Sequence, residues 1–271
     1  GKNCQQNGKK NSFLHNFLNL GCKITKKIVT LQTLLIILSC RFMKKSFEPS
    51  WIDKNFEISS LLQDVPIGQL FVLTDTNSAK YCLPLFAEFI GEIPYNLLVV
   101  KAGEEHKNIE TVNGIYEYLI KNRFDRQDVL VALGGGVVGD MTGYAAATYL
   151  RGIDFIQVPT TLLSQTDSSI GGKTGIDFMQ YKNMVGAFYM PKMVYMNLAV
   201  LESLSKEQLV SGFGEILKHG LIKDIAYFEW LKAHYDEIWM LNYDVLEEMI
   251  YVSCNIKREV VERDAKEKGE R

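Results

Sequence analysis

The chain has 271 residues, of which 47% are hydrophobic and 23% are charged, and its formal net charge is −2. This balance is typical of a globular protein with a sizeable core, and it gives no reason to expect nucleic acid or a membrane as a partner. The five cysteines are odd in number and form no Cys-x-x-Cys pair. We therefore expect a reducing, cytoplasmic setting and no disulfide framework.

Residues 1–42 differ from the rest, because they are rich in Asn, Lys and Gln and then carry the apolar run 28–39. The run is too short to span a bilayer, and Gln32 and two threonines interrupt it. We interpret 1–42 as an atypical leader, disordered or non-native, with Met43 as a candidate start. An added helix or strand, or a targeting signal, is the alternative.

From Leu70 onward, apolar runs typical of buried strands alternate with segments of helical period, which implies a parallel sheet. From Ser205 onward the period is helical almost throughout. The sequence thus predicts an α/β fold, with a Rossmann-like nucleotide-binding domain at 43–200 and the start of an all-α domain at 201–271. The predicted strands are 70–75, 96–101, 129–133, 155–158 and 193–196, and the predicted helices are 110–122, 142–149, 207–223, 226–233 and 243–262.

The segment Gly134–Gly139 satisfies G-x-G-x-x-G between a predicted strand and a predicted helix. Backbone N–H groups at such a helix start can bind a phosphate, and the alternative is a tight turn that packs helix against strand. The motif does not follow the first strand, so it is not the standard Rossmann fingerprint. Glu104, or Asp75 with Asn77, supplies a polar group for a ribose after another strand. A P-loop is rejected, because Asp167 stands where that motif needs glycine.

A second group of polar residues follows the predicted strand 155–158. The hydroxyls of Thr160 and Thr161 can reach a bound ligand there. The segment beyond them is predicted to be a polar, glycine-rich loop outside the core, and it carries Asp167, Lys173, Lys182 and Asn183.

Glu215, Lys218 and His219 share one face of the predicted helix 207–223 at i, i+3 and i+4. A surface ion pair is the alternative, but the two preceding glycines favour a close approach to another element. Basic residues gathered around these segments of a net-acidic chain favour a substrate with carboxylate and phosphate groups. They are Arg151, Lys173, Lys182, Lys218, Lys257 and Arg271.

These motifs resemble, in order and spacing, those of the 3-dehydroquinate synthases, which are NAD- and zinc-dependent sugar phosphate cyclases. The resemblance runs from about Leu70 to Arg271, through Gly103–Lys107, Leu133–Asp140, Gln157–Leu163, Asp167–Gly175 and Gly214–Lys218. It implies that Zn²⁺ or Co²⁺ binds at Glu215. It implies that substrate contacts Asp167, Lys173, Asn183, Lys218, Lys257, Arg271 and Arg151, the last across a homodimer. It implies that NAD contacts Asp75, Asn77, Glu104, Lys107, Gly135, Gly136, Val137, Val138, Gly139, Asp140, Thr160, Thr161, Lys182 and Ser203.

The resemblance implies a phosphate-eliminating lyase of the shikimate pathway, which makes 3-dehydroquinate from 3-deoxy-D-arabino-heptulosonate 7-phosphate. The family's other two metal ligands are histidines beyond an Arg-x-x-Leu-Asn-x-Gly-His motif, whose first residue matches Arg271. A catalytic zinc needs about three protein ligands, so we expect this chain, with Glu215 as its one ligand, to have little or no activity. The alternatives are another cyclase such as a 2-deoxy-scyllo-inosose synthase, a metal-dependent polyol dehydrogenase, and a non-catalytic NAD-binding or dimerising module.

Overall fold

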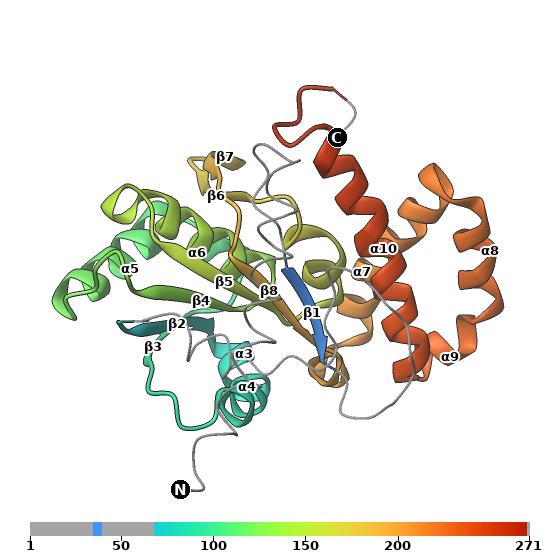
Figure 1. Cartoon of the computed structure of the whole chain (residues 1–271), viewed down its shortest axis with the longest axis horizontal. Coiled ribbons are helices and arrows are strands. Elements are labelled where there is room, and N and C mark those ends of the chain that lie inside the picture. The colour runs from blue at the N-terminus through green and yellow to red at the C-terminus, as the bar shows by residue number, and fades with distance from the viewer. Residues whose placement is uncertain (1–34, 40–67, 270–271) are drawn as a thin grey trace, which may run out of the picture. The chain divides into compact units, whose positions relative to one another are not determined.

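A computed structural model describes residues 35–39 and 68–269, which fall in one compact unit. Its centre is a parallel sheet in the order β1-β8-β5-β4-β2-β3 (Figure 1). The parallel sheet predicted from the alternation of strands and helices is confirmed. The strands are β1 (Leu35–Ser39), β2 (Leu70–Asp75), β3 (Asn96–Val100), β4 (Val129–Gly134), β5 (Asp154–Pro159) and β8 (Met193–Asn197).

The central strands are apolar at consecutive positions because both faces of the sheet are covered. In β2, Phe71 and Leu73 join one apolar cluster, and Leu70 and Val72 join another. The first cluster contains α5 (Ile109–Lys121) and α6 (Gly136–Thr148). The second contains residues of α4 (Leu83–Ile90), which follows α3 (Thr76–Tyr81), and of the C-terminal helices.

The region after β8 is helical, as the sequence predicts. Its first long helix begins with a capping box, in which the Ser205 side chain accepts from the Gln208 N–H and the Gln208 side chain accepts from the Ser205 N–H. The apolar cluster that begins under the sheet continues into these helices through Phe213, Ile216 and Met249. The predicted boundary at residue 200 therefore lies inside a continuous core. The elements are η4 (Leu198–Ser203), α7 (Lys206–Lys223), α8 (Ile225–Ala233), α9 (Tyr235–Trp239) and α10 (Tyr243–Arg263).

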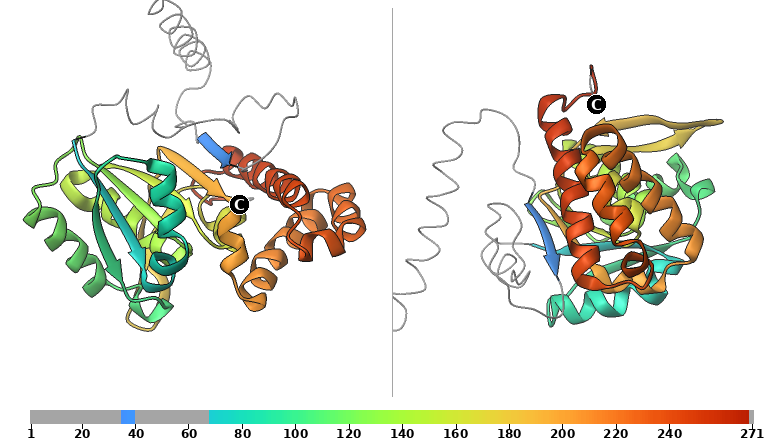
Figure 2. Two further views of the ribbon diagram at one scale, coloured as in Figure 1. Left: turned by 90° about the horizontal axis from the view of Figure 1, so that it is seen from below. Right: turned by 90° about the vertical axis from the view of Figure 1, so that its right-hand side faces the viewer.

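The segment predicted as a polar loop after β5 has regular structure. It forms a π-helix, η3 (Ser164–Ser168), and then the antiparallel hairpin β6 (Lys173–Phe178) and β7 (Tyr181–Phe188), which projects from the sheet (Figure 2). The loop prediction was wrong because two of its glycines pair strands closely. A Cβ on Gly186 would lie 2.2 Å from the Thr174 carbonyl oxygen.

Strand β1 lies within the segment 1–42, which the sequence places outside the fold. Its five residues pair in parallel with β8, from Leu35 opposite Met193 to Ser39 opposite Asn197. They belong to the apolar run 28–39, whose composition suits a strand as well as a leader. The other residues of 1–42 lie outside the described residues. Within the described ranges, no helix combines the length and the hydropathy that crossing a membrane requires.

Substitutions at two glycines of α7 can test how the helical region packs on the sheet region. A Cβ on Gly212 would lie 2.6 Å from the Leu163 backbone nitrogen, whereas one on Gly214 would meet nothing within 4 Å. Gly212→Ala should lower the free energy of unfolding by about 1–3 kcal/mol through overpacking. Gly214→Ala should raise it by up to about 1 kcal/mol, because alanine favours the helix. Urea denaturation measures both, and equal effects at the two positions would refute this packing.

Candidate active site

The predicted glycine motif opens a helix at the carboxyl end of β4. Gly135 is the N-cap of α6, and because glycine has no side chain, no capping side chain takes up the first N–H groups of the helix. Residues Gly136–Asp140 form the first turn and a half, with Val138 buried. The structural alternative is also realised, because a Cβ on Gly134 would lie 2.6 Å from the Val138 side chain. The glycines therefore let α6 pack closely on β4, and they also leave the backbone N–H groups at the start of α6 uncovered by side chains.

Three of the polar residues predicted to contact a dinucleotide, Asp75, Asn77 and Thr160, lie at or just after the ends of β2 and β5. Asp75 caps α3, and its carboxylate accepts from the N–H groups of Asn77 and Ser78 at 2.8 Å each. The Ser78 hydroxyl lies 3.4 Å from the hydroxyl of buried Thr160. Asn77 is exposed, which leaves its side chain available at this edge. β2 and β5 flank β4, and the carboxyl ends of parallel strands are where open α/β sheets bind ligands.

Two further predicted residues make local hydrogen bonds. Thr161 exchanges hydrogen bonds with the Ser164 hydroxyl and N–H at the start of η3. Ser203 donates from its hydroxyl to the Val200 carbonyl at the end of η4. Both side chains therefore already have partners within their own turns.

Lys107 is buried, and its hydrogen bonds join three elements. Its ammonium donates to Asp140 Oδ2 of α6 at 2.6 Å and to Asn183 Oδ1 of β7 at 2.5 Å. The Asp177 N–H of β6 donates to the Lys107 carbonyl at 2.8 Å, and the Asn183 N–H donates to Asp177 Oδ1 at 2.8 Å. Burial raises the pKa of Asp140, and the charge of Lys107 opposes that shift. The prediction that Lys107 contacts a cofactor stays a prediction, but its ammonium already holds the hairpin against α6.

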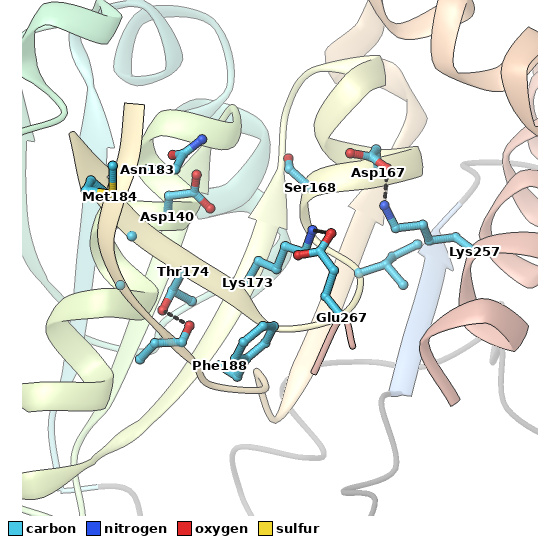
Figure 3. A pocket seen from close by; sticks show the side chains of 14 residues that line it. Asp140, Asp167, Ser168, Lys173, Thr174, Asn183, Met184, Phe188, Lys257 and Glu267 are labelled. Atoms are coloured by element: carbon cyan, nitrogen blue, oxygen red, sulfur yellow. Dashed lines mark hydrogen bonds and ion pairs between the residues drawn. The ribbon is translucent and has the colours of Figure 1, made fainter. Parts of the chain in front are cut away.

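A cavity of about 560 Å³ lies between this hairpin, α6, η3 and α10 (Figure 3). Five predicted site residues line it: Asp140, Asp167, Lys173, Asn183 and Lys257. The sequence did not indicate Glu267, which also lines the cavity and forms an ion pair with Lys173. Lys257 of α10 reaches across to form an ion pair with Asp167 of η3. The cavity wall is thus rich in charges of both signs.

Three side chains that could hold a metal ion converge beside η3. One ligand atom each from Asp167, Glu215 and His219 lies within 4.8 Å of the other two. Carboxylate oxygen and imidazole nitrogen are donors that suit Zn²⁺ and Co²⁺, so the residues fit a divalent metal. In the part of the chain described, Glu215 is therefore accompanied by two further candidate ligands. The sequence signal that points to His219 is its i+4 spacing from Glu215.

The electrostatics of this cluster follow from burial and two lysines. Burial acts to raise the pKa of Asp167, but Lys257 and then Lys218 outweigh it and the pKa is lowered. Burial and the charge of Lys257 lower the pKa of His219 to about 4, so its imidazole is neutral at pH 7. His219 Nδ1 lies 2.6 Å from the hydroxyl of buried Ser253 on α10. Lys218 forms an ion pair with Glu215, as the surface-pair alternative predicted.

Not every predicted residue reaches the cavity. Lys182 is on the exposed side of the hairpin, where it forms an ion pair with Glu104 at 3.5 Å. Arg151 ends the short helix η2 (Tyr149–Arg151) beyond α6, with an exposed side chain that does not line the cavity. Arg271 lies outside the described residues. Its predicted contact with substrate, and that of Arg151 across a dimer, stay predictions.

Comparison with known proteins assigns this arrangement to a family. The model of "3-dehydroquinate synthase N-terminal" matches residues 97–211, and that of "3-dehydroquinate synthase C-terminal" matches residues 212–271. The chain belongs to the 3-dehydroquinate synthase family. A 3-dehydroquinate synthase of Acetivibrio thermocellus is 44% identical over 243 residues, which are 87% of this chain and 66% of that protein. The family resemblance predicted from the motifs is thus confirmed.

Solved structures of related cyclases share the fold. The 2-epi-5-epi-valiolone synthase ValA of Streptomyces hygroscopicus, solved with NAD⁺ and Zn²⁺, gives a TM-score of 0.76 at 21% identity. It covers 89% of this chain, and the match is 65% of ValA. A 2-deoxy-scyllo-inosose synthase complexed with carbaglucose-6-phosphate, NAD⁺ and Co²⁺ gives 0.68 at 29% identity, over 78% of this chain and 60% of that one. The chain thus spans less than two thirds of the length of each of these proteins.

The buried ammonium of Lys107 should be essential to the fold. Lys107→Met leaves Asp140 without its charge partner, and removing one member of a buried pair costs about 3–5 kcal/mol. Lys121→Met is the matched control, because Lys121 pairs with Glu117 on the surface of α5. An exposed pair of that kind contributes about 0–1 kcal/mol. Thermal and urea unfolding of both variants give the comparison, and similar small losses would contradict the role of Lys107.

The buried imidazole of His219 should make the metal-free protein sensitive to mild acid. The unfolded chain binds this proton near pH 6.5, whereas the folded chain binds it only near pH 4. Folding therefore releases a proton between these values, and stability falls as the pH drops from 7 to 5, by about 2 kcal/mol from this group. Urea unfolding in EDTA measures the change. His219→Gln should lose this part of the pH dependence, and an unchanged slope would exclude His219 as its source.

Proposed function

We propose that the protein is a 3-dehydroquinate synthase. It would act as a carbon–oxygen lyase on 3-deoxy-D-arabino-heptulosonate 7-phosphate, releasing phosphate and 3-dehydroquinate. The observation that carries the proposal is the cavity in which Lys173 and Lys257 face Asp167 beside the first turn of α6. That cavity joins cations for an anionic substrate to a helix start suited to a dinucleotide, in a chain of this family.

The reaction would need NAD and a divalent metal. NAD would accept and return a hydride, and the metal would polarise the substrate hydroxyl that is oxidised. The open N–H groups at the start of α6 would hold the NAD pyrophosphate, as at other helix N-termini. Glu215 would be a ligand of the metal, and its carboxylate suits Zn²⁺ or Co²⁺.

The lysines of the site would bind the substrate's anionic groups. Each now pairs with a carboxylate: Lys173 with Glu267, Lys218 with Glu215, and Lys257 with Asp167. Lys173 and Lys257 line the cavity, and Lys218 is close enough to Asp167 for its charge to lower the pKa of that carboxyl. A substrate carboxylate or phosphate would replace the protein carboxylates as their partner, and charge-assisted hydrogen bonds of this kind are strong. Asp167, ionised at neutral pH, would then be free to accept a hydrogen bond from a substrate hydroxyl.

The residues of the hairpin would position the substrate. Asn183 has a left-handed backbone, with φ of 53°, and its side-chain oxygen accepts from Lys107. Its amide NH₂ therefore remains to donate to the cavity that Asn183 lines. Because Lys107 also holds Asp140 at the start of α6, the cofactor and substrate residues are joined by one network.

The setting of the protein is proposed on the same grounds. The cysteines among the described residues, Cys82 and Cys254, are free and buried, which supports a reducing cytoplasm. A homodimer, with Arg151 reaching the partner's site, is proposed from the family resemblance and from the exposed position of Arg151. A 2-deoxy-scyllo-inosose synthase is the second candidate, favoured by the 29% identity and shared fold described above. Comparing turnover of the two cyclase substrates separates these activities.

Lys218→Gln should lower kcat/KM for phosphate release about 100-fold or more in the whole protein, because one cation that stabilises developing charge is lost. Lys232→Gln is the matched control, since Lys232 forms the same i,i+3 pair with Glu229 on the surface of α8. Its activity should stay within about twofold of wild type, because losing an exposed ion pair has little effect. Equal activity of the two variants, or no phosphate release by the whole protein, would reject the proposed function.

A further inference from the structure

We propose that Asp177 is a positioning residue, whose carboxylate holds Asn183 in the conformation that turns its side chain into the cavity. Asp177 Oδ1 accepts from the Asn183 N–H at 2.8 Å. Asp177 itself does not line the cavity; it lines a separate hollow of about 490 Å³ with Glu104 and Phe178. The inference rests on the proposed function, in which the Asn183 amide binds substrate, and it adds a residue that acts through Asn183 alone.

The first argument is an irregularity in the hairpin. The pairing register of β6 and β7 shifts after Ile176, so that Asp177 stands opposite three residues of β7, 182–184. Bulges of this kind re-aim side chains and are common next to active sites. In a regular strand, successive side chains point to opposite faces. Here Asn183 and Met184 are consecutive, yet both line the cavity (Figure 3). The bulge therefore brings Asn183 to the cavity.

The second argument is the backbone of Asn183. Its φ of 53° is left-handed, a conformation that few residues other than glycine adopt and that asparagine tolerates. A bulged residue loses its regular place in the ladder, and its N–H then needs another acceptor. Asp177 supplies an acceptor from the facing strand. The carboxylate thus stands in for a strand carbonyl and holds Asn183 in its left-handed form.

The third argument is that three residues form a closed cycle of hydrogen bonds. The Asp177 N–H donates to the Lys107 carbonyl at 2.8 Å, and the Lys107 ammonium donates to Asn183 Oδ1 at 2.5 Å. The Asn183 N–H donates to Asp177 and completes the cycle. Asn183 is therefore held at two atoms, its backbone nitrogen and its side-chain oxygen. These two points set the direction in which its NH₂ group can donate to a ligand in the cavity.

Crystal structures and hydrogen exchange of the 271-residue protein test this geometry without turnover. In Asp177→Ala, the Asn183 side chain should leave the cavity and its N–H should exchange about 3–10-fold faster, the range that one lost hydrogen bond gives. Asp177→Asn keeps an acceptor oxygen at that position, so its structure and exchange should match those of wild type. An Asn183 that keeps its left-handed backbone and its exchange rate in Asp177→Ala would overturn the proposal.

Steady-state phosphate release by the whole protein tests the consequence for the substrate. Asp177→Ala should raise KM about 3–10-fold and change kcat less, because a contact present throughout the reaction is weakened. Asp177→Asn should stay within about twofold, since the acceptor matters and the negative charge does not. Asp154→Ala is the matched control, because Asp154 is an exposed aspartate of β5 that pairs with Lys192, and its KM should stay within about twofold. An unchanged KM in Asp177→Ala would also overturn the proposal.

A double-mutant cycle separates positioning from general damage to the hairpin. Asn183→Gly removes the side chain and accepts a left-handed backbone. In that background, Asp177→Ala should raise KM by less than about twofold, because the group that it positions is gone. A full additional loss would show that Asp177 acts elsewhere and would refute the positioning role. If the wild type releases no phosphate, the proposed function is rejected, and the structures of the variants still decide the role of Asp177.

Discussion

One buried ammonium holds the site together. Lys107 lies between Asp140 of α6 and Asn183 of β7, so it joins the helix that the glycine motif opens to the hairpin that covers it. A buried charge is tolerated only when its hydrogen bonds are satisfied, and here a carboxylate and an amide oxygen satisfy them. Other contacts, such as the Asp177 N–H bond to the Lys107 carbonyl and the packing of the hairpin on α6, add to this link. The cavity depends on the position of the hairpin, because the hairpin forms one wall.

The site combines acids and lysines in nearly equal number. Asp167, Glu215 and Glu267 each form an ion pair with a lysine, so the acidic charges of the site are balanced locally. Such an arrangement suits the binding of a cation together with an anionic ligand. The cation can pair with the carboxylates, and the lysines that this releases can pair with the anion.

The sheet and the long helices could be predicted from the sequence, because their apolar periodicity is local. The continuous runs at 70–75 and 129–133 indicated strands covered on both faces, and that is how β2 and β4 lie. The hairpin could not be predicted, because its glycines read as loop residues and its strand pairing depends on contact with α6. The same limit applies to β1, whose pairing with β8 joins segments far apart in the chain.

The site was predicted in its parts but not in its assembly. Motif order indicated Asp167, Lys173 and Glu215, while nothing local to His219 pointed to Ser253, 34 residues further on. Glu267 likewise meets Lys173 across 94 residues. Residues that meet through tertiary packing have no fixed spacing in the sequence. A polar face of a helix can therefore be recognised from the sequence, but the residues that contact it cannot.

The order of the strands has a consequence for synthesis. Among the described residues β1 is the first strand, but it pairs with β8, the last strand of the sheet. As the chain leaves the ribosome, β2, β3, β4 and β5 can pair with one another before β8, the partner of β1, has been synthesised. An apolar edge strand without a partner is prone to pair with other chains. The apolar segment of β1 therefore stays without its strand partner until β8 has been synthesised.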